Sequence, residues 1–153
     1  PFEGCMKCSN YIGETLDMAL DMGVKGILFV SHIGKFVKVA GGIMNTHSRC
    51  ADSRAELLAA NAIRAGISMD GVKEILDTIT TDEALSVILR ENLLEPLMKE
   101  LTDRILYYLN HRTYDRMLLG AVVFSNEYGY LGETKNTREL IRLIKDQYKK
   151  PSI

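Results

Sequence analysis

A histidine and two lysines open the stretch of this sequence whose side chains are best suited to chemistry. Lys35 and Lys38 are three positions apart, so on a helix their ammonium groups would point to one side. Two such groups could bind carboxylates or phosphates, although a solvated helix face explains the charge pattern equally well. We expect His32, just before them, to bind or orient a ligand rather than transfer a proton. The commoner role of a lone histidine is to hold a loop by hydrogen bonds.

A second set of hydrogen-bonding side chains follows closely. Four consecutive polar residues with mixed donors and acceptors are followed there by a cation, as Asn45, Thr46, His47, Ser48 and Arg49. We expect His47 to bind or orient a ligand as His32 does. Arg49 and Arg54 could supply further counter-charge to an anion. Asp52 is expected to cap a helix or pair with one of these arginines rather than act in catalysis.

Glycines separate the two sets. Gly41 and Gly42 would let the backbone approach a ligand closely, and they would also end a short helix that begins near Gly34. Gly34 and Lys35 do not form a phosphate-binding P-loop, because Phe36 stands where that motif requires Ser or Thr. The sequence also lacks a dinucleotide-binding glycine pattern and a nucleophile elbow.

The hydrophobic pattern predicts an α/β fold that would position these side chains. Residues 25–31 and 117–124 are apolar runs without alternation, which is typical of parallel strands covered on both faces. A strand that ends in a polar, glycine-containing turn is the usual position of a site in an open α/β sheet. We therefore predict one domain over residues 1–153, with a mostly parallel sheet, helices on both faces, a helical middle segment and a site after the strand at 25–31.

Helix signals fill most of the remaining chain. Apolar spacing, capping residues and terminal glycines predict helices at about 10–22, 34–40, 53–65, 69–76, 81–91, 94–109 and 137–148. Capping boxes are predicted at Ser53 with Glu56 and at Thr80 with Glu83. Residues 125–129 predict a turn, with a brief extended segment after it. The middle helices are expected to serve packing rather than chemistry.

The composition limits the possible function classes. The chain has 153 residues and a formal net charge of −1, so no global positive field would attract nucleic acid or anionic lipid. No apolar run approaches the ~20 residues of a membrane span, and no signal-peptide pattern opens the sequence. The small odd number of cysteines indicates a reducing, cytoplasmic environment. Cys5 and Cys8 lack the second pair of a structural zinc site, so we expect no metal and assign no role to these cysteines or to Cys50.

Three motifs resemble one protein family in their order and spacing. They are Ser9-Asn10-Tyr11-Ile12-Gly13-Glu14, Ser31-His32-Ile33-Gly34-Lys35-Phe36-Val37-Lys38-Val39-Ala40-Gly41-Gly42, and Asn45-Thr46-His47-Ser48-Arg49 with Ala51-Asp52. The combination resembles the C-terminal part of the cobalt-precorrin-5B C1-methyltransferases, the CbiD-type enzymes of anaerobic cobalamin biosynthesis. The similarity is strongest from Ser9 to Ala65, and Cys50 departs from the aliphatic residue expected at its position.

The resemblance implies a reaction and a missing partner. It implies S-adenosylmethionine-dependent methylation of a ring carbon of a cobalt-bearing tetrapyrrole, from cobalt-precorrin-5B to cobalt-precorrin-6A. Family members are longer and carry an N-terminal domain with a Gly-Tyr-Thr-Thr-Gly type motif, which this sequence lacks. We therefore expect the chain to be the C-terminal domain of a two-domain enzyme, whose activity alone would depend on that missing domain. The oligomeric state is left open.

The two implied ligands divide the candidate residues into two groups. The candidates for binding the tetrapyrrole substrate are His32, Lys35, Lys38, Asn45, Thr46, His47, Ser48 and Arg49. Among the cations, Lys35, Lys38, Arg49 and Arg54 would suit its carboxylates as counter-charges. The candidates for binding S-adenosylmethionine are Asn10, Gly34, Gly41 and Gly42, since backbone groups at helix starts suit anions. Catalysis would come mainly from holding two substrates close and aligned, and no residue is identified as catalytic.

Two other classes of function also fit the sequence. One is a non-catalytic module that binds an anionic metabolite or a tetrapyrrole. The other is a helical interaction domain whose partner surface is formed by residues 94–109, which would require an exposed apolar stripe on that helix.

Overall fold

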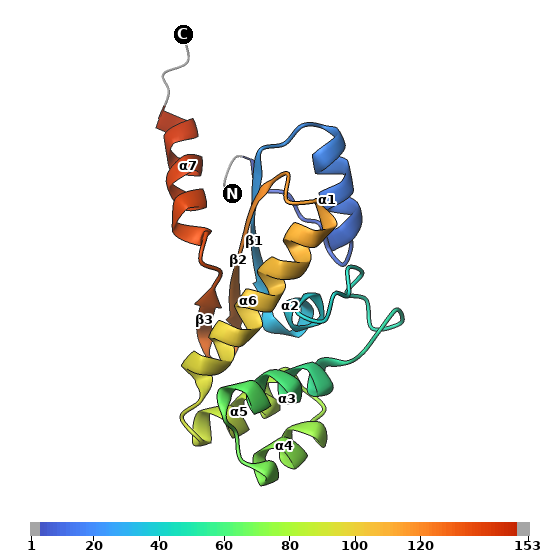
Figure 1. The fold of residues 1–153 in the computed structure, drawn as a ribbon, viewed down its shortest axis with the longest axis vertical. Coiled ribbons are helices and arrows are strands. Elements are labelled where there is room, and N and C mark those ends of the chain that lie inside the picture. Colours follow the sequence, from blue (N-terminus) through green and yellow to red (C-terminus); the bar gives the residue numbers. More distant parts are fainter. Residues whose placement is uncertain (1–3, 150–153) are drawn as a thin grey trace.

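A computed structural model describes residues 4–149 as a small sheet surrounded by helices (Figure 1). The elements in chain order are α1 (Ile12–Asp21), β1 (Gly26–His32), α2 (Ile33–Val39), α3 (Arg54–Ala65), α4 (Met69–Leu76), α5 (Thr81–Arg90), α6 (Leu94–Arg112), β2 (Leu118–Ser125), β3 (Gly129–Glu133) and α7 (Thr137–Lys149). The α/β class predicted from the sequence is therefore confirmed, and the predicted helices and strands are present with small shifts at their ends.

The sheet is mixed, which corrects the prediction of a mostly parallel sheet. Its strand order is β1-β2-β3, with β1 and β2 parallel and β2 and β3 antiparallel. A parallel pair needs a long crossover, and the helical segment from α2 to α6 supplies it. The turn between Ser125 and Gly129 is too short for a crossover, so the chain turns back as a hairpin. The backbone N–H of Tyr128 donates to Ser125 Oγ within this turn.

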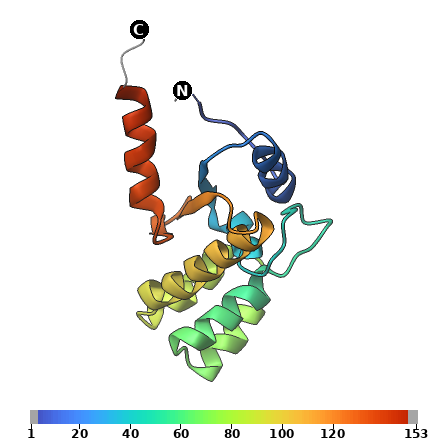
Figure 2. The ribbon, with the colours of Figure 1, turned by 45° about the horizontal axis from the view of Figure 1, so that its top comes forward.

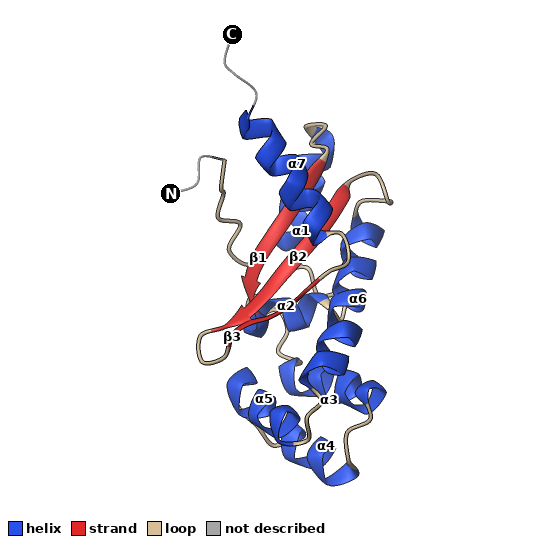
Figure 3. Cartoon of the chain, turned by 90° about the vertical axis from the view of Figure 1, so that its left-hand side faces the viewer, coloured by secondary structure: helices blue, strands red, loops and turns tan. Residues whose placement is uncertain are grey.

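Helices lie on both faces of the sheet, but they cover the two faces unequally. We call the face toward α2 and α6 the inner face and the face toward α7 the outer face. On β2, Leu119, Ala121 and Val123 are fully buried against the inner layer. Figure 3 shows α7 lying over only part of the outer face, away from the strand ends that approach α2.

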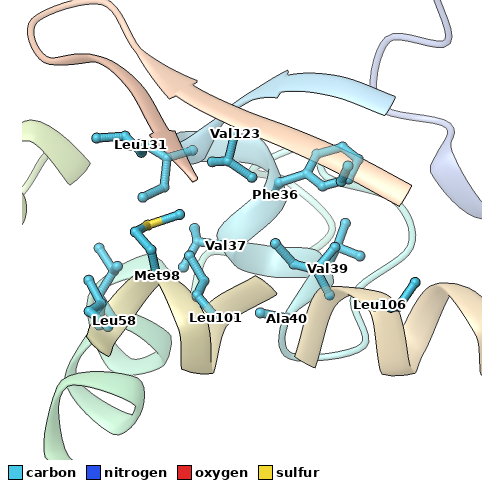
Figure 4. Close-up of a cluster of buried hydrophobic side chains, with 14 of the residues drawn as sticks. Phe36, Val37, Val39, Ala40, Leu58, Met98, Leu101, Leu106, Val123 and Leu131 are labelled. Carbon is cyan, nitrogen blue, oxygen red and sulfur yellow. The ribbon is translucent and has the colours of Figure 1, made fainter. Parts of the chain in front are cut away.

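The main core lies between the inner face, α2 and α6. The short helix α2 places Phe36, Val37 and Val39 against this core, and each is at most 1% exposed. Figure 4 shows these side chains meeting residues of α6 and of the two neighbouring strands, including Met98, Leu101, Leu106, Val123 and Leu131. A helix of seven residues is too short to be stable alone, so its position is set by this packing.

Helices α3, α4 and α5 pack together beyond the strand ends (Figure 2). The capping box of Thr80 and Glu83 is present at the start of α5, as predicted. The box predicted at Ser53 is absent: Ser53 is the N-cap of α3, but its side chain makes no capping hydrogen bond there. Most apolar residues of α6 are buried, Leu97 and Leu101 completely, and Tyr107 is its one large apolar side chain that is well exposed, at 60%. The exposed apolar stripe required by an interaction domain at 94–109 is therefore not present.

Candidate anion-binding site

An open cleft of about 540 Å³ lies at the carboxyl ends of β1 and β2. It is bounded by the end of β1, the first turns of α2 and α5, the loop before α3 and the turn after β2. Six substrate-binding candidates line it: His32, Lys35, Lys38, Thr46, His47 and Ser48. Asn10 and Gly34, from the cofactor-binding group, line the same cleft. A cleft thus lies where the sequence analysis expected a site, after the strand at 25–31. That these residues bind the ligands assigned to them stays a prediction.

The two histidines of the cleft are held in the same way. His32 Nδ1 accepts from the Gly34 N–H at 2.9 Å, and His47 Nδ1 accepts from the Arg49 N–H at 3.1 Å. A neutral imidazole that accepts at Nδ1 carries its proton on Nε2. Each ring thus fixes its own loop and keeps an Nε2–H donor. The ring of His32 also lies edge-on to Phe124, with centroids 5.7 Å apart.

The two lysines of α2 differ in environment although both line the cleft. Lys38 is only 2% exposed, and its Nζ donates to the carbonyl oxygens of Thr46 at 3.0 Å and Ala51 at 2.8 Å. Burial lowers the pKa of Lys38, and the nearby Asp52 carboxylate partly opposes that shift. Lys35 is exposed, and among residues 4–149 its ammonium has no hydrogen-bond or ion-pair partner. Lys38 therefore holds the loop before α3, and Lys35 is free to meet a ligand.

The start of α1 is joined to the same loop, which Figure 2 shows beside α1. Thr46 Oγ1 donates to Asn10 Oδ1 at 3.0 Å, and the Thr46 N–H donates to the Asn10 carbonyl oxygen at 3.0 Å. The Gly13 N–H donates to the carbonyl oxygen of Met44. These bonds bring Asn10 into the cleft from a distant part of the sequence.

Arg54 adds a further cation to the lining. Its guanidinium donates to both carboxylate oxygens of Asp52, at 2.8 and 3.2 Å, which confirms the pairing expected for Asp52. This bond lowers the pKa of Asp52 below its ordinary value. Arg54 is thus partly neutralised, so Lys35 is the cation of the cleft with the most freedom to bind an anion.

Four candidates lie outside the cleft lining, and the structure shows other contacts for most of them. Gly42 has a φ of +80°, and a Cβ there would lie 2.8 Å from the ring of Tyr108. A Cβ at Gly41 would lie 2.7 Å from the side chain of Leu57. Asn45 Oδ1 accepts from the His47 N–H, and Arg49 is exposed on the loop. The two glycines thus allow close packing of the loop after α2.

The first turn of α5 is a part of the cleft that the sequence reading missed. Thr80, Thr81 and Asp82 line the cleft from this turn. Thr81 is only 5% exposed, and its hydroxyl has no hydrogen-bond partner within residues 4–149. Asp82 Oδ1 is buried in the same range without a partner. The capping box marked the start of this helix, but its approach to β1 depends on the packing of α3 to α6. Asn126, also in the lining, directly follows β2. It could have been predicted from the sequence, because ligand sites in open α/β sheets lie at the carboxyl ends of strands.

The described part of the chain shows neither a metal-binding cluster nor a membrane-spanning helix. Within residues 4–149, no group of three or more His, Cys, Asp or Glu residues is placed to hold a metal ion. The three cysteines in this range are free thiols. None of the helices described has the length and hydropathy to cross a membrane.

Comparison with known proteins gives the class to which this fold and cleft belong. The family model described as "CbiD, C-terminal domain" matches residues 45–135, more than half of the chain. The chain therefore belongs to the CbiD family, as the resemblance of its motifs indicated. No solved structure matches it.

The relatives that share this family are cobalt-precorrin-5B C(1)-methyltransferases. The protein of that name from Ruminiclostridium cellulolyticum is 45% identical over 79% of this chain and 32% of its own length. The one from Alkaliphilus metalliredigens is 37% identical over 93% of this chain and 37% of its own length. The one from Sulfolobus acidocaldarius is 34% identical over 80% of this chain and 34% of its own length. The chain thus spans about a third of the length of these relatives.

Proposed function

We propose that this chain acts as a substrate-binding part of an S-adenosylmethionine-dependent C-methyltransferase that converts cobalt-precorrin-5B to cobalt-precorrin-6A. The cleft at the strand ends would hold the carboxylates on the rim of the tetrapyrrole. The observation that carries this proposal is the convergence of Lys35, Lys38 and Arg54 on one cleft in a chain of net charge −1. The names of the relatives supply the identity of the reaction.

The chemistry of the lining favours carboxylates over the adenosine of the methyl donor. Lys35 offers a free ammonium, and the two histidines offer Nε2–H donors fixed by their loops. Charge-assisted hydrogen bonds of this kind suit carboxylate oxygens. Among the described residues, no aliphatic, phenyl or phenol side chain lines the cleft, so an adenine ring would find none of these side chains to pack against. Of the cofactor-binding candidates in the lining, Asn10 fits the carboxylate of S-adenosylmethionine through its amide NH2 group, whereas the Gly34 N–H is already donated to His32 Nδ1. The adenosine part would need other residues of the enzyme.

The chain would contribute to the reaction mainly by position. S-adenosylmethionine supplies the methyl group when bound. Holding the macrocycle by its carboxylates would fix the ring carbon at one place relative to that donor, which is a large source of rate enhancement. The rigid attachment of α2 to the core favours this role, because Lys35 stands on a helix whose other side is fully packed.

Methyl transfer is the direct test. The chain is incubated with cobalt-precorrin-5B and S-adenosylmethionine, alone and with the remaining two thirds of a relative supplied as a separate protein. We expect methylated product, measured by mass spectrometry, when both parts are present. No product with both parts, while the full-length relative is active, would contradict a catalytic role for this chain.

Substitutions of residues that line the cleft test whether it binds the carboxylates of the tetrapyrrole. Lys35→Ala should raise the Kd for cobalt-precorrin-5B by about tenfold, because it removes an unpaired cation from the lining. Asp82→Asn should lower that Kd, because it removes a negative charge beside the bound carboxylates. Lys73→Ala, on the exposed side of α4, is the matched control and should leave the Kd unchanged. Equal Kd values for all three variants would remove the carboxylate cleft from the proposal.

A non-catalytic binding module is the second candidate function. The same cleft supports it, and so does the coverage of only a third of the enzymes in question. Binding of the tetrapyrrole without methyl transfer, in the presence of the remaining part of the enzyme, would favour this second function.

A further inference from the structure

The outer face of the sheet is covered over only half of its length. Leu140 of α7 packs where a Cβ on Gly26 or Gly120 would meet its methyl groups, at 3.1 and 2.8 Å. These two glycines lie in the amino-terminal halves of β1 and β2. Figure 3 shows that α7 then leaves the sheet, so within residues 4–149 no helix lies over the halves of the strands that end near α2.

The uncovered half presents apolar side chains in register. Val30 of β1 pairs with Val122 of β2, and Phe124 of β2 pairs with Tyr130 of β3. Val30 is 66% exposed and Tyr130 is 62% exposed, while Val122 and Phe124 between them are partly exposed. We call these four residues the apolar platform. At its far edge stands Glu133, whose carboxylate pairs with Arg138 of α7.

His32 connects this platform to the cleft. It lies two positions after Val30 on β1, so both side chains lie on the same face of the sheet. Its ring lies edge-on to Phe124 of the platform, and the same residue lines the cleft with Lys35. A flat apolar surface therefore continues directly into a polar cleft with a free cation.

We propose that the platform binds the flat face of the tetrapyrrole while the carboxylates on its rim enter the cleft. This inference rests on the proposed function, and it adds the surface that receives the ring. The complementarity argues for this occupant: the ligand joins an apolar disc to peripheral carboxylates, and the protein joins an apolar strip to a cationic cleft at His32. Three strands spaced about 4.8 Å apart form a strip about 10 Å wide, which is comparable with such a ring.

Binding of a stable corrinoid by the whole chain tests the platform. The probe is cobyrinic acid, which carries carboxylates around its ring, and its fully amidated form is the comparison ligand. Titration is followed by the absorbance of the corrinoid. For the variant with Val30→Ser and Tyr130→Ser, we expect the Kd for cobyrinic acid to rise by about tenfold or more, because two apolar contacts are lost. Lys35→Ala should raise the Kd for cobyrinic acid and leave the Kd for the amidated form unchanged.

The control substitution has matched exposure at a distant position. Met69 of α4 is 67% exposed, close to the value for Val30, and Met69→Ser should leave the Kd unchanged. Circular dichroism checks that the double variant is folded. If it is not, Val30→Thr replaces it, because threonine keeps the β-branched shape that suits a strand.

Two results would overturn the inference. They are the absence of corrinoid binding by the unmodified chain and an unchanged Kd in the platform variant. If the Kd is unchanged and the oligomeric mass of that variant differs from that of the unmodified chain, the platform is a contact between protein chains. Methyl transfer decides the proposed function separately, so an enzyme that methylates cobalt-precorrin-5B with an altered platform would retain that function and lose only this docking surface.

Discussion

The two sides of α2 differ in almost every physical respect. On the core side, Phe36 and Val37 fill the space against the sheet and α6 and have almost no exposed surface. On the cleft side, Lys35 is exposed and polar groups surround an open space. The comparison shows how a short helix can be rigid and still offer a ligand site. Packing on one side fixes the helix, and this also fixes the backbone that carries the side chains of the other side.

Lys38 belongs to both sides. Its side chain is buried as deeply as the core residues, yet it carries an ammonium that lines the cleft and bonds two backbone carbonyls of the loop. Substitution of Phe36 should therefore change stability alone, and substitution of Lys35 should change ligand binding alone. Substitution of Lys38 should change both.

Removing a large side chain from the core side should affect stability alone. Phe36→Ala should lower the free energy of unfolding by about 3–5 kcal/mol, because it deletes a ring from a close-packed site. Denaturant unfolding measures the change, and Ile79→Ala, at an 82% exposed position, serves as control. The Kd of the folded variant for a carboxylate ligand should stay the same. A loss of stability no larger than that of the control would show that α2 is not fixed by this packing.

Replacing the shared lysine should affect both properties. Lys38→Met keeps the length of the side chain but leaves the carbonyl oxygens of Thr46 and Ala51 without their donor, which should cost about 1–3 kcal/mol. The Kd for a carboxylate ligand should also rise. Lys35→Met is the matched control and should raise the Kd while changing stability by less than about 0.5 kcal/mol. Equal stability of the two variants would contradict the holding role of Lys38.

The glycine after α2 tests whether close approach serves packing or a ligand. Gly42→Ala should destabilise the protein by about 1–3 kcal/mol, since it combines a positive φ with a Cβ too close to Tyr108. Gly23→Ala is the matched control, because Gly23 also has a positive φ but has no atom within 4 Å of the added Cβ. The excess loss at Gly42 then measures the contact with Tyr108. A higher Kd for S-adenosylmethionine with unchanged stability would instead indicate that Gly42 contacts this ligand.

Much of this arrangement was predictable from local sequence pattern. The unalternating run at 25–31 predicted β1, and the polar turn after it predicted where a cleft would lie. The capping box at Thr80 predicted the start of α5. These signals succeed because each depends on residues that are neighbours in the chain.

The features that sequence reading missed depend on distant parts of the chain. The sequence alone does not distinguish Lys35 from Lys38. The path of the following loop makes Lys38 a buried hydrogen-bond donor and leaves Lys35 as an unpaired cation in the described chain. The place of Asp82 in the cleft depends on how the helices after α2 pack, which no local pattern records. The antiparallel strand β3 was underestimated because only a short extended segment follows the turn at 125–129.

The smallest effect concerns α1, which brings Asn10 to the cleft and is tied to α6 by one surface ion pair. Arg112 donates to both carboxylate oxygens of Asp17, at 2.9 and 2.7 Å, and this bond lowers the pKa of Asp17 below its ordinary 3.8. Because the folded pKa is the lower one, the pair stabilises the protein above the ordinary value, and the effect is lost as the pH falls through the lowered pKa. Both side chains are substantially exposed, so the contribution should be only about 0.2–1 kcal/mol.

Unfolding free energies of the unmodified chain and of Asp17→Asn, measured from neutral to acidic pH, test this pair. The difference between them should be present at neutral pH and should shrink toward zero at the acid end. Asp21→Asn, on the same helix and without an ion pair in the described chain, should show no such difference at neutral pH. If the difference at Asp17 were instead constant with pH, the loss would come from packing near Gly13, where Arg112 also lies close, and the tie between α1 and α6 would not be electrostatic.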